Sequence, residues 1–274
     1  MKNTSKKIID DFSDEWKKFD QSKLDNNELK SIFEDYFNIF PFHLINKKSE
    51  GFDLGCGTGR WAKMIAPKVY KLNLIEPSDS ILIAEKNLQD YNNITFYKEN
   101  VMNISLKNNS QDFGYALGVF HHIEDTGKAL KISTTLLKRN APFLIYLYYA
   151  FDNRGTYYKL IWKFSNYIRK VICVLPNPIK NVVTDIIAFF VYMPISKLIL
   201  LLEKFGLNVK ALPLYYYRNK SFYTMRTDSR DRFGTFLEKR FTKKQIKKLM
   251  LDANLTNITF SEQSPYWCVL GFKK

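Results

Sequence analysis

A glycine-rich turn and two acidic side chains are the residues whose types and spacing best suit the binding of a nucleoside-containing ligand. Gly55, Gly57 and Gly59 alternate with other residues directly after Asp53. Backbone that passes close under a ligand has no room for Cβ atoms, and glycine adopts angles that other residues resist. Glu76 ends the next apolar segment, and a carboxylate in that place can accept hydrogen bonds from both ribose hydroxyls.

The spacing of the turn distinguishes it from a dinucleotide-binding turn. That fingerprint reads G-x-G-x-x-G, whereas this turn reads G-x-G-x-G, with Arg60 where the last glycine would stand. A tight turn and a surface acid at the end of a strand are the structural alternatives for the glycines and Glu76. Because the two features occur one strand apart, we favour ligand binding.

Two further groups of residues could act on a substrate. His121 and His122 follow the fourth apolar segment, and histidine exchanges a proton near neutral pH, so either is a candidate general base. The alternative is that one packs under the ligand and the other closes a turn. Tyr223 and Arg226 lie where polar and aromatic residues alternate, and an arginine there could grip an anionic group. A surface loop held by ion pairs is the equal alternative.

Strand-like and helix-like segments must position these residues, and they alternate along the chain. This alternation predicts an α/β fold, with a doubly wound, mostly parallel sheet and helices on both faces. Thr242 is expected to cap the last helix. The predicted strands span residues 51–54, 71–75, 94–97, 113–119, 142–149, 257–261 and 267–272, and the predicted helices span 20–40, 60–66, 78–90, 126–138 and 242–253.

The alternation stops between residues 151 and 240, which are aromatic, basic and mostly helical in pattern. This stretch contains 16 Lys and Arg against 6 Asp and Glu. We therefore expect an N-terminal helical segment (1–50), a ligand-binding core (51–150), a helical insertion after the fifth strand that covers the substrate (151–240) and a C-terminal completion of the sheet (241–274).

Composition limits the choice of partners and compartment. The formal net charge of +15 over 274 residues suits either an acidic partner or a solvated lysine surface, and the scattered lysines favour the latter. Three dispersed cysteines offer no metal-binding spacing, so no metal is expected. The beginning of the chain shows no apolar leader, which indicates the cytoplasm. Residues 182–202 are strongly apolar; we favour a buried helix over one at a membrane surface, and both over a membrane span.

Taken together, the motifs resemble the class I, Rossmann-like S-adenosylmethionine-dependent methyltransferases. The resemblance covers residues 51–149 and 242–272 and is specific jointly rather than motif by motif. DLGCGTGR (53–60), LIEPS (74–78), FYKENVMNI (96–104) and FGYALGVFHHIED (113–125) are similar to the family's first four motifs, the last in its small-molecule form.

The resemblance implies a seven-stranded sheet of order 3-2-1-4-5-7-6 with the last strand antiparallel, and S-adenosylmethionine as cofactor. Asn100 replaces the acidic residue that usually contacts adenine, although its amide oxygen can still accept a hydrogen bond. The implied cofactor contacts are Asp53, Gly55, Cys56, Gly57, Gly59, Glu76, Pro77, Asn100, Val101, Leu117 and Gly118.

The expected acceptor is a small or lipid-linked molecule, hydrophobic or anionic, with peripheral membrane contact through residues 182–202. DNA is not expected, because Val119-Phe120-His121-His122 stands where DNA amino-methyltransferases carry Asn or Asp followed by Pro-Pro-aromatic, and no Pro-Cys pair occurs. RNA methylation, a nicotinamide-dependent oxidoreductase and a non-catalytic scaffold stay open as alternatives.

Overall fold

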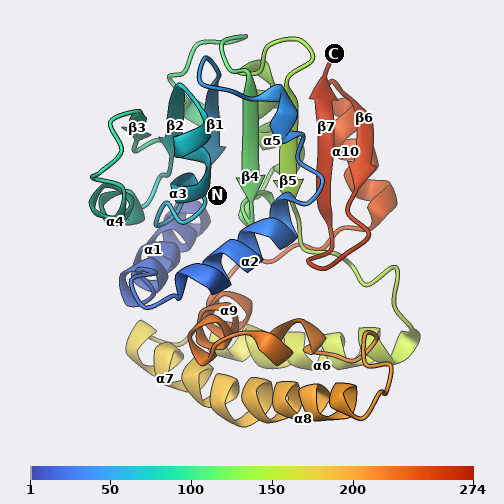
Figure 1. Ribbon diagram of the computed structural model, residues 1–274. Coiled ribbons are helices and arrows are strands. Elements are labelled where there is room, and N and C mark those ends of the chain that lie inside the picture. Colours follow the sequence, from blue (N-terminus) through green and yellow to red (C-terminus); the bar gives the residue numbers. More distant parts are fainter. Residues whose placement is uncertain (1) are drawn as a thin grey trace. The chain divides into compact units, whose positions relative to one another are not determined.

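The chain divides into two units in the computed structural model, which describes residues 2–274 and the side chains from Lys6 onward. Unit 1 comprises Met1–Gln21, Leu29–Ala150 and Leu237–Lys274, and unit 2 comprises Ser22–Glu28 and Phe151–Phe236. Figure 1 shows the elements of both. The two units are described separately below.

A seven-stranded sheet forms the centre of unit 1, and its order is β3-β2-β1-β4-β5-β7-β6. The first five strands run parallel, and β7 is antiparallel to both β5 and β6. The sequence-based prediction of this sheet is therefore confirmed. The strands are β1 (Glu50–Leu54), β2 (Lys71–Ile75), β3 (Ile94–Tyr97), β4 (Phe113–Leu117), β5 (Pro142–Tyr146), β6 (Leu255–Phe260) and β7 (Cys268–Lys273).

Register places the segments that follow the parallel strands at one edge of this sheet. Asp53 on β1 lies opposite Leu74 on β2 and Tyr115 on β4. The residues after β1, β2, β3 and β4 therefore leave the sheet side by side. This is the edge at which open α/β sheets bind their ligands.

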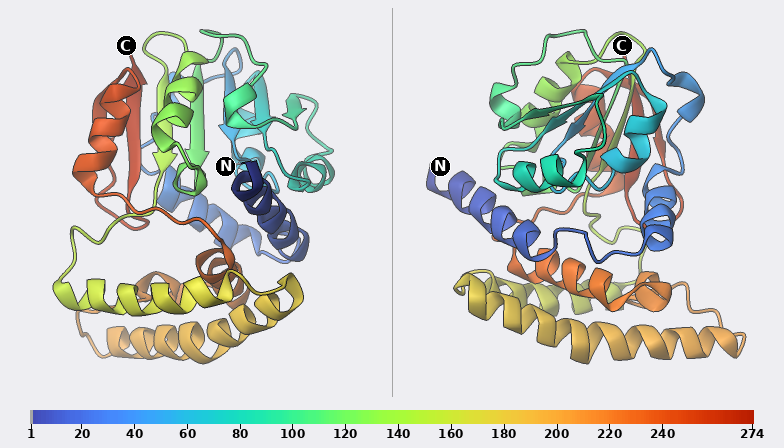
Figure 2. Two further views of the ribbon diagram at one scale, coloured as in Figure 1. Left: turned by 180° about the vertical axis from the view of Figure 1, so that it is seen from behind. Right: turned by 60° about the vertical axis from the view of Figure 1, so that its left-hand side comes forward.

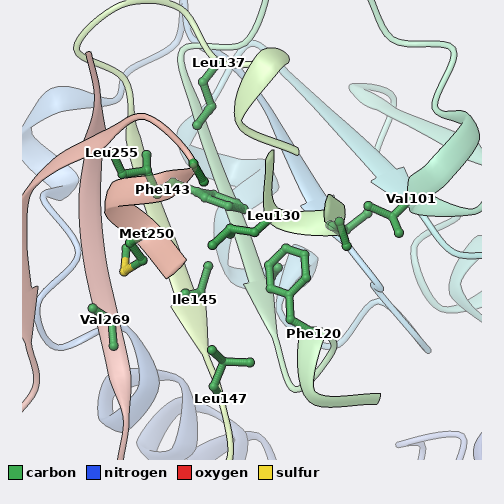
Figure 3. Packing of buried hydrophobic residues seen from close by; sticks show 14 of the residues in the cluster. Val101, Phe120, Leu130, Leu137, Phe143, Ile145, Leu147, Met250, Leu255 and Val269 are labelled. Atoms are coloured by element: carbon green, nitrogen blue, oxygen red, sulfur yellow. The ribbon is translucent and has the colours of Figure 1, made fainter. Parts of the chain in front are cut away.

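Helices cover both faces of the sheet because its strands are apolar on both sides. Phe143, Leu130 and Met250 belong to the core between the sheet and helices α5 and α10, which Figure 3 shows from close by. Figure 2 shows the two helices from behind. On the opposite face, Phe37 of α2 packs edge-on against Tyr115, with 5.3 Å between ring centroids. Helices thus cover both faces with apolar side chains, and the strand ends are left as the place for a polar ligand.

The helices of unit 1 are mostly shorter than the sequence predicted. The predicted helix 20–40 is ordered as α2 over 26–37, and the predicted strand 142–149 ends at Tyr146. Thr242 caps α10 through a reciprocal pair of hydrogen bonds with Gln245, as predicted. The helices are α1 (Lys2–Lys18), α2 (Asn26–Phe37), α3 (Ala62–Ile65), α4 (Ser80–Asn87), α5 (Thr126–Thr135) and α10 (Lys243–Asp252), with short 3-10 turns η1 (Phe42–Leu44), η2 (Ala66–Lys68), η3 (Val101–Asn103) and η4 (Phe120–His122).

Unit 2 is helical and has a small apolar interior. That interior is formed by Ile172, Tyr192, Met225 and Phe233. Its helices are α6 (Thr156–Ile172), α7 (Asn177–Ile187), the π-helical turn η5 (Ala188–Tyr192), α8 (Met193–Lys204), the 3-10 turn η6 (Tyr215–Asn219) and α9 (Phe222–Gly234).

One alternative and one expectation for unit 2 need correction. Residues 221–234 form helix α9 rather than a surface loop, because the Ser221 hydroxyl accepts a hydrogen bond from Thr224 N (3.2 Å) and caps the helix. The apolar residues 182–202 are mostly not buried. They belong to a continuous 28-residue helix, Asn177–Lys204. Of the residues in its most apolar stretch, 22% are buried. Within the described part of the chain it is the one helix long and apolar enough to cross a membrane, by length and composition alone.

Candidate cofactor and active site

The turn after β1 is built from glycines whose backbone other residues tolerate poorly. Gly55 and Gly57 have φ of 71° and 54°, in the left-handed region. A Cβ on Gly55 would lie 2.4 Å from a methyl group of Val119, and a Cβ on Gly57 would lie 3.2 Å from the Trp16 indole. Gly59 is also left-handed, at 77°. The turn thus exposes backbone rather than side chains toward its surroundings.

Glu76 is joined to this turn by a hydrogen bond. Gly57 N donates to Oε2 of Glu76 (3.2 Å), and Ser78 N donates to Oε1 (3.0 Å). The carboxyl is buried, and burial raises its pKa despite these hydrogen bonds. The structure therefore brings together the acid and the turn that the sequence pairs one strand apart.

Asp53 is a buried acid without a normal partner. It is 1% exposed, and within the described residues neither of its carboxyl oxygens makes a hydrogen bond of normal geometry, although the Tyr115 hydroxyl lies beside it. Burial raises the pKa of Asp53 to about 8. A buried carboxyl this poorly satisfied is expected to gain a partner from a bound ligand. A cationic group, such as the α-amino group of S-adenosylmethionine, fits that requirement.

The other predicted contacts lie at the same strand ends. The backbone at Gly118 has φ of 84°, and a Cβ there would meet no described atom within 4 Å, so the chain after Leu117 borders open space. Asn100 Oδ1 accepts a hydrogen bond from Met102 N (3.0 Å) and caps η3, which fixes the amide beside Val101. Pro77 follows Glu76 directly and is partly exposed.

Cys56 is fully enclosed in the turn, so its thiol is not a nucleophile. Burial, followed by the charges of Asp53 and Glu76, raises the pKa of the Cys56 thiol well above its usual range. No group of three or more His, Cys, Asp or Glu that could hold a metal ion occurs in the described residues.

Helix α1 lies over the glycine turn, which sequence reasoning did not anticipate. Trp16 is the residue that a side chain at Gly57 would meet. Asp79 N, near the start of α4, donates to the Ser13 hydroxyl (3.1 Å). The guanidinium of Arg60 lies 5.6 Å from the centre of the Trp16 ring. An aromatic residue in an otherwise strongly charged helix was the available signal for this contact.

The two histidines occupy η4, directly after β4, and are both buried. The His121 ring stacks on Tyr148, with 3.8 Å between centroids, and neither of its nitrogens has a hydrogen-bond partner among the described residues. Burial, then the charges of His122 and Arg240, holds the pKa of His121 well below its usual value, so the ring is neutral.

The second histidine has a defined partner. His122 Nδ1 lies 2.6 Å from the carbonyl oxygen of Leu237. A carbonyl can only accept, so this nitrogen carries the proton in the neutral ring, and the lone pair is on Nε2. The two imidazole rings are 4.1 Å apart. The two histidines that the sequence singled out thus form a buried pair. His122 is held by a hydrogen bond, and His121 makes none among the described residues.

Tyr223 and Arg226 lie on α9 in unit 2. Arg226 donates from Nε and Nη2 to both oxygens of Asp185 (3.0 and 2.8 Å) and so joins α9 to α7. The Tyr223 carbonyl accepts from the hydroxyl of Thr227 (3.1 Å). In the alternative of a loop held by its own ion pairs, Arg226 would pair within residues 221–234; the structure pairs it with Asp185 of α7. A contact of Tyr223 or Arg226 with substrate stays a prediction.

Comparison with known proteins agrees with this architecture. The sequence model of the methyltransferase domain matches residues 52–145. A search of curated proteins found no match. A solved candidate S-adenosyl-L-methionine-dependent methyltransferase from Methanococcus maripaludis is 16% identical and similar over 96% of this chain and 94% of its own, with a TM-score of 0.53. A candidate methyltransferase from Bacillus halodurans is 9% identical over 84% and 70% of the two chains, with a TM-score of 0.52. At such identities the structural likeness concerns the fold.

The fold and the turn define a nucleoside-binding α/β protein of the Rossmann-like class. Residues 52–145 of unit 1 match the model of a methyltransferase domain, and S-adenosylmethionine is the cofactor that this match indicates. When bound, this cofactor supplies a methyl group already activated on a sulfonium. We expect the protein to bind and orient it: Glu76 at the ribose, Asp53 at the amino group, and the backbone of Val101, Leu117 and Gly118 along the adenosyl part.

Proposed function

We propose that this methyltransferase acts on a small acceptor that carries a hydrophobic, lipid-like part. The observation that supports this proposal most is the wall of unit 1 that follows β4 and β5, which is rich in aromatic rings. His121 stacks on Tyr148, Tyr146 lies edge-on to both rings, and Phe12 of α1 lies edge-on to His122. A largely apolar wall with few polar atoms favours an apolar ligand that is oriented by one or two hydrogen bonds.

His121 provides the polar atoms of this wall. In the neutral ring, one of its two unpartnered nitrogens can accept a hydrogen bond from the hydroxyl or amine of an acceptor. A bound cofactor would supply the methyl group, and the imidazole of His121 would take the proton that the hydroxyl or amine of the acceptor loses. Because the pKa of His121 is low, the ring loses that proton readily and is ready for the next turnover.

Two residues of unit 2 complete the proposal. We place Tyr223 and Arg226 at the acceptor, with the guanidinium facing an anionic group such as a phosphate. Asp185 already fixes the guanidinium through two hydrogen bonds, so an anionic group would meet a preoriented cation. The exposed apolar residues of 182–202 suit an acceptor that is embedded in a membrane, and we propose a cytoplasmic protein that works at that surface.

The test is a comparison of cells that express the chain, the Gly57→Arg variant or neither. Extracts are separated into organic and aqueous phases and searched by mass spectrometry for a species heavier by one CH2 in the first cells alone. A product in the organic phase supports the proposal. A product in the aqueous phase would contradict the proposal. Methyl label recovered in RNA would also contradict it and would favour RNA methylation instead.

A further inference from the structure

We infer that unit 2 docks on a bilayer that contains anionic lipids, through an apolar face formed by α6 and by the continuous helix of α7, η5 and α8. This inference deepens the proposed function and rests on it for the reason a membrane is needed. Three observations support the face itself: the exposure of its side chains, the buried polar groups behind it and the charges beside it.

Exposed apolar side chains are concentrated in unit 2. Of the large apolar side chains exposed in the described residues, 20 belong to unit 2 and four to the larger unit 1. Phe164 is 70% exposed, Phe190 69% and Phe205 75%. Soluble monomers rarely expose contiguous apolar patches of more than a few hundred Å². This density of exposed apolar side chains therefore requires a partner.

These side chains fall on one side of each helix. On α6 they recur at helical spacing, and the same holds along the continuous helix. The residues of this face are Tyr157, Leu160, Phe164, Tyr167 and Val171 on α6, and Ile179, Val182, Ile186, Phe190, Leu198 and Leu201 on the continuous helix.

The opposite, buried side of the continuous helix carries polar groups beside the apolar Tyr192 and Ile199. Lys180, Thr184 and Ser196 are each at most 1% exposed. The hydroxyl of Ser229 on α9 donates to the carbonyl of Thr184 (2.8 Å), and Arg230 Nε, also on α9, donates to Oδ1 of Asn181 (3.0 Å). A helix at the surface of a water-soluble protein has the reverse pattern, with its apolar side inward. The helix therefore buries several polar groups and leaves a row of large apolar side chains exposed, as suits a lipid surface.

Charge decides which partner fits. On helices α6, α7 and α8, all of which the structure describes, the two acidic side chains are ion-paired: Asp185 with Arg226, and Glu203 with Arg218. The exposed charges of these helices are all lysines, which flank the apolar face, namely Lys159, Lys163, Lys170, Lys197 and Lys204. Lysines beside an interfacial apolar face favour anionic headgroups. A second copy of the chain would bring lysine against lysine.

The experiment uses the full chain and sedimentation with lipid vesicles. We expect binding to phosphatidylcholine vesicles that contain phosphatidylglycerol, roughly tenfold weaker binding to phosphatidylcholine alone, and weakening by salt. Chain that stays in the supernatant with both vesicle types would overturn the inference.

Variants locate the face. The pair Phe164→Glu and Phe190→Glu should abolish vesicle binding, whereas the exposed apolar residues of unit 1 offer a matched control pair, Leu82→Glu and Leu251→Glu. The triple change to Gln at Lys159, Lys163 and Lys170 should remove the preference for anionic lipid. The same change at Lys86, Lys244 and Lys247 of unit 1 removes equal charge and should not.

Two other outcomes would refute the docking mode. A dimer in solution that the Phe164→Glu and Phe190→Glu pair dissociates would assign the face to a second copy. Vesicle-bound chain that alkaline carbonate cannot extract would indicate a membrane span. Calorimetric binding of S-adenosylhomocysteine by every variant shows that unit 1 is folded. A chain that docks but yields no methylated lipid would defeat the proposed acceptor alone.

Discussion

The backbone N–H of Gly57 donates to the carboxylate of Glu76 across 3.2 Å, and this contact links the turns that follow two neighbouring strands. The glycine stands in the left-handed region, with Trp16 close to the place of a Cβ. The acid is thereby held beside backbone that leaves room for a ligand. The first two predictions follow from this pair.

Gly57→Arg should abolish binding of S-adenosylhomocysteine. Any side chain here is strained by the positive φ, at a cost of about 1–2 kcal/mol, and arginine must in addition displace Trp16. Isothermal titration calorimetry is the measurement. Gly127→Ala is the control, because a Cβ there would make ordinary contact with Leu249 at 3.6 Å. Unchanged binding by the arginine variant would refute the placement of the cofactor.

Glu76→Gln should weaken binding of S-adenosylhomocysteine by roughly 10- to 100-fold, since hydrogen bonds to a charged group are each worth about 1.5–3 kcal/mol. Equilibrium dialysis or calorimetry measures the loss. Glu85→Gln removes an exposed acid from α4 and serves as control. Equal affinity of the Glu76 variant and the control would mean that Glu76 only ties the two turns together.

Asp53 should make cofactor affinity depend on pH. Burial raises its pKa from 3.8 to about 8, so the carboxyl is protonated at neutral pH before ligand binds. A cationic ligand group favours the carboxylate, so binding releases a proton within this window and affinity rises with pH up to about 8. Calorimetry at pH 7 in buffers of different ionisation enthalpy counts the protons released.

The same shift has the opposite sign for stability of the ligand-free chain. Between pH 3.8 and about 8 the native state holds a proton on Asp53 that the unfolded chain has lost, so this contribution to stability falls as pH rises. Asp53→Asn should remove both effects. A wild-type affinity that does not vary with pH would contradict this account.

His121→Phe should reduce turnover by roughly 10²-fold while leaving S-adenosylhomocysteine affinity within about twofold, because the ring stack on Tyr148 survives and the nitrogens are lost. The wild-type rate should show no inflection near pH 6–7 from His121, since burial lowers its pKa. His43→Phe, outside this wall, is the control. A rate equal to wild type in the His121 variant would exclude a proton-transfer role.

Arg226→Ala and Asp185→Asn separate the two roles of the ion pair between α9 and α7. If Arg226 meets the acceptor, its loss should cut turnover at least tenfold more than loss of Asp185, with cofactor affinity unchanged in both. Both groups are about a third exposed, so each change should cost about 1 kcal/mol of stability or less. Tyr223→Phe should behave like Arg226→Ala. If both variants lose little turnover and equal stability, the ion pair between Arg226 and Asp185 has a purely structural role.

Much of unit 1 could be predicted because its signals are local. The apolar runs placed every strand to within a few residues, the G-x-G-x-G turn and Glu76 indicated the ligand edge, and Thr242 capped its helix. The order of the strands followed from resemblance to a family. The position of Trp16 over Gly57 could not be predicted, because it joins residues far apart in the chain whose contact no local pattern records.

Unit 2 shows what the sequence alone could not predict. Its sequence indicates apolar and amphipathic helices, and hydropathy alone suggested a buried one. On α7, contacts with α9 set which side of the helix faces inward. Asp185 pairs with Arg226, Asn181 accepts a hydrogen bond from Arg230, and the Thr184 carbonyl accepts one from Ser229. Those polar contacts turn the apolar side outward. Residue types and their spacing thus suffice for the cofactor edge, where function resides in backbone and strand ends. The direction of the apolar face depends on long-range polar pairing, and that arises only once the chain has folded.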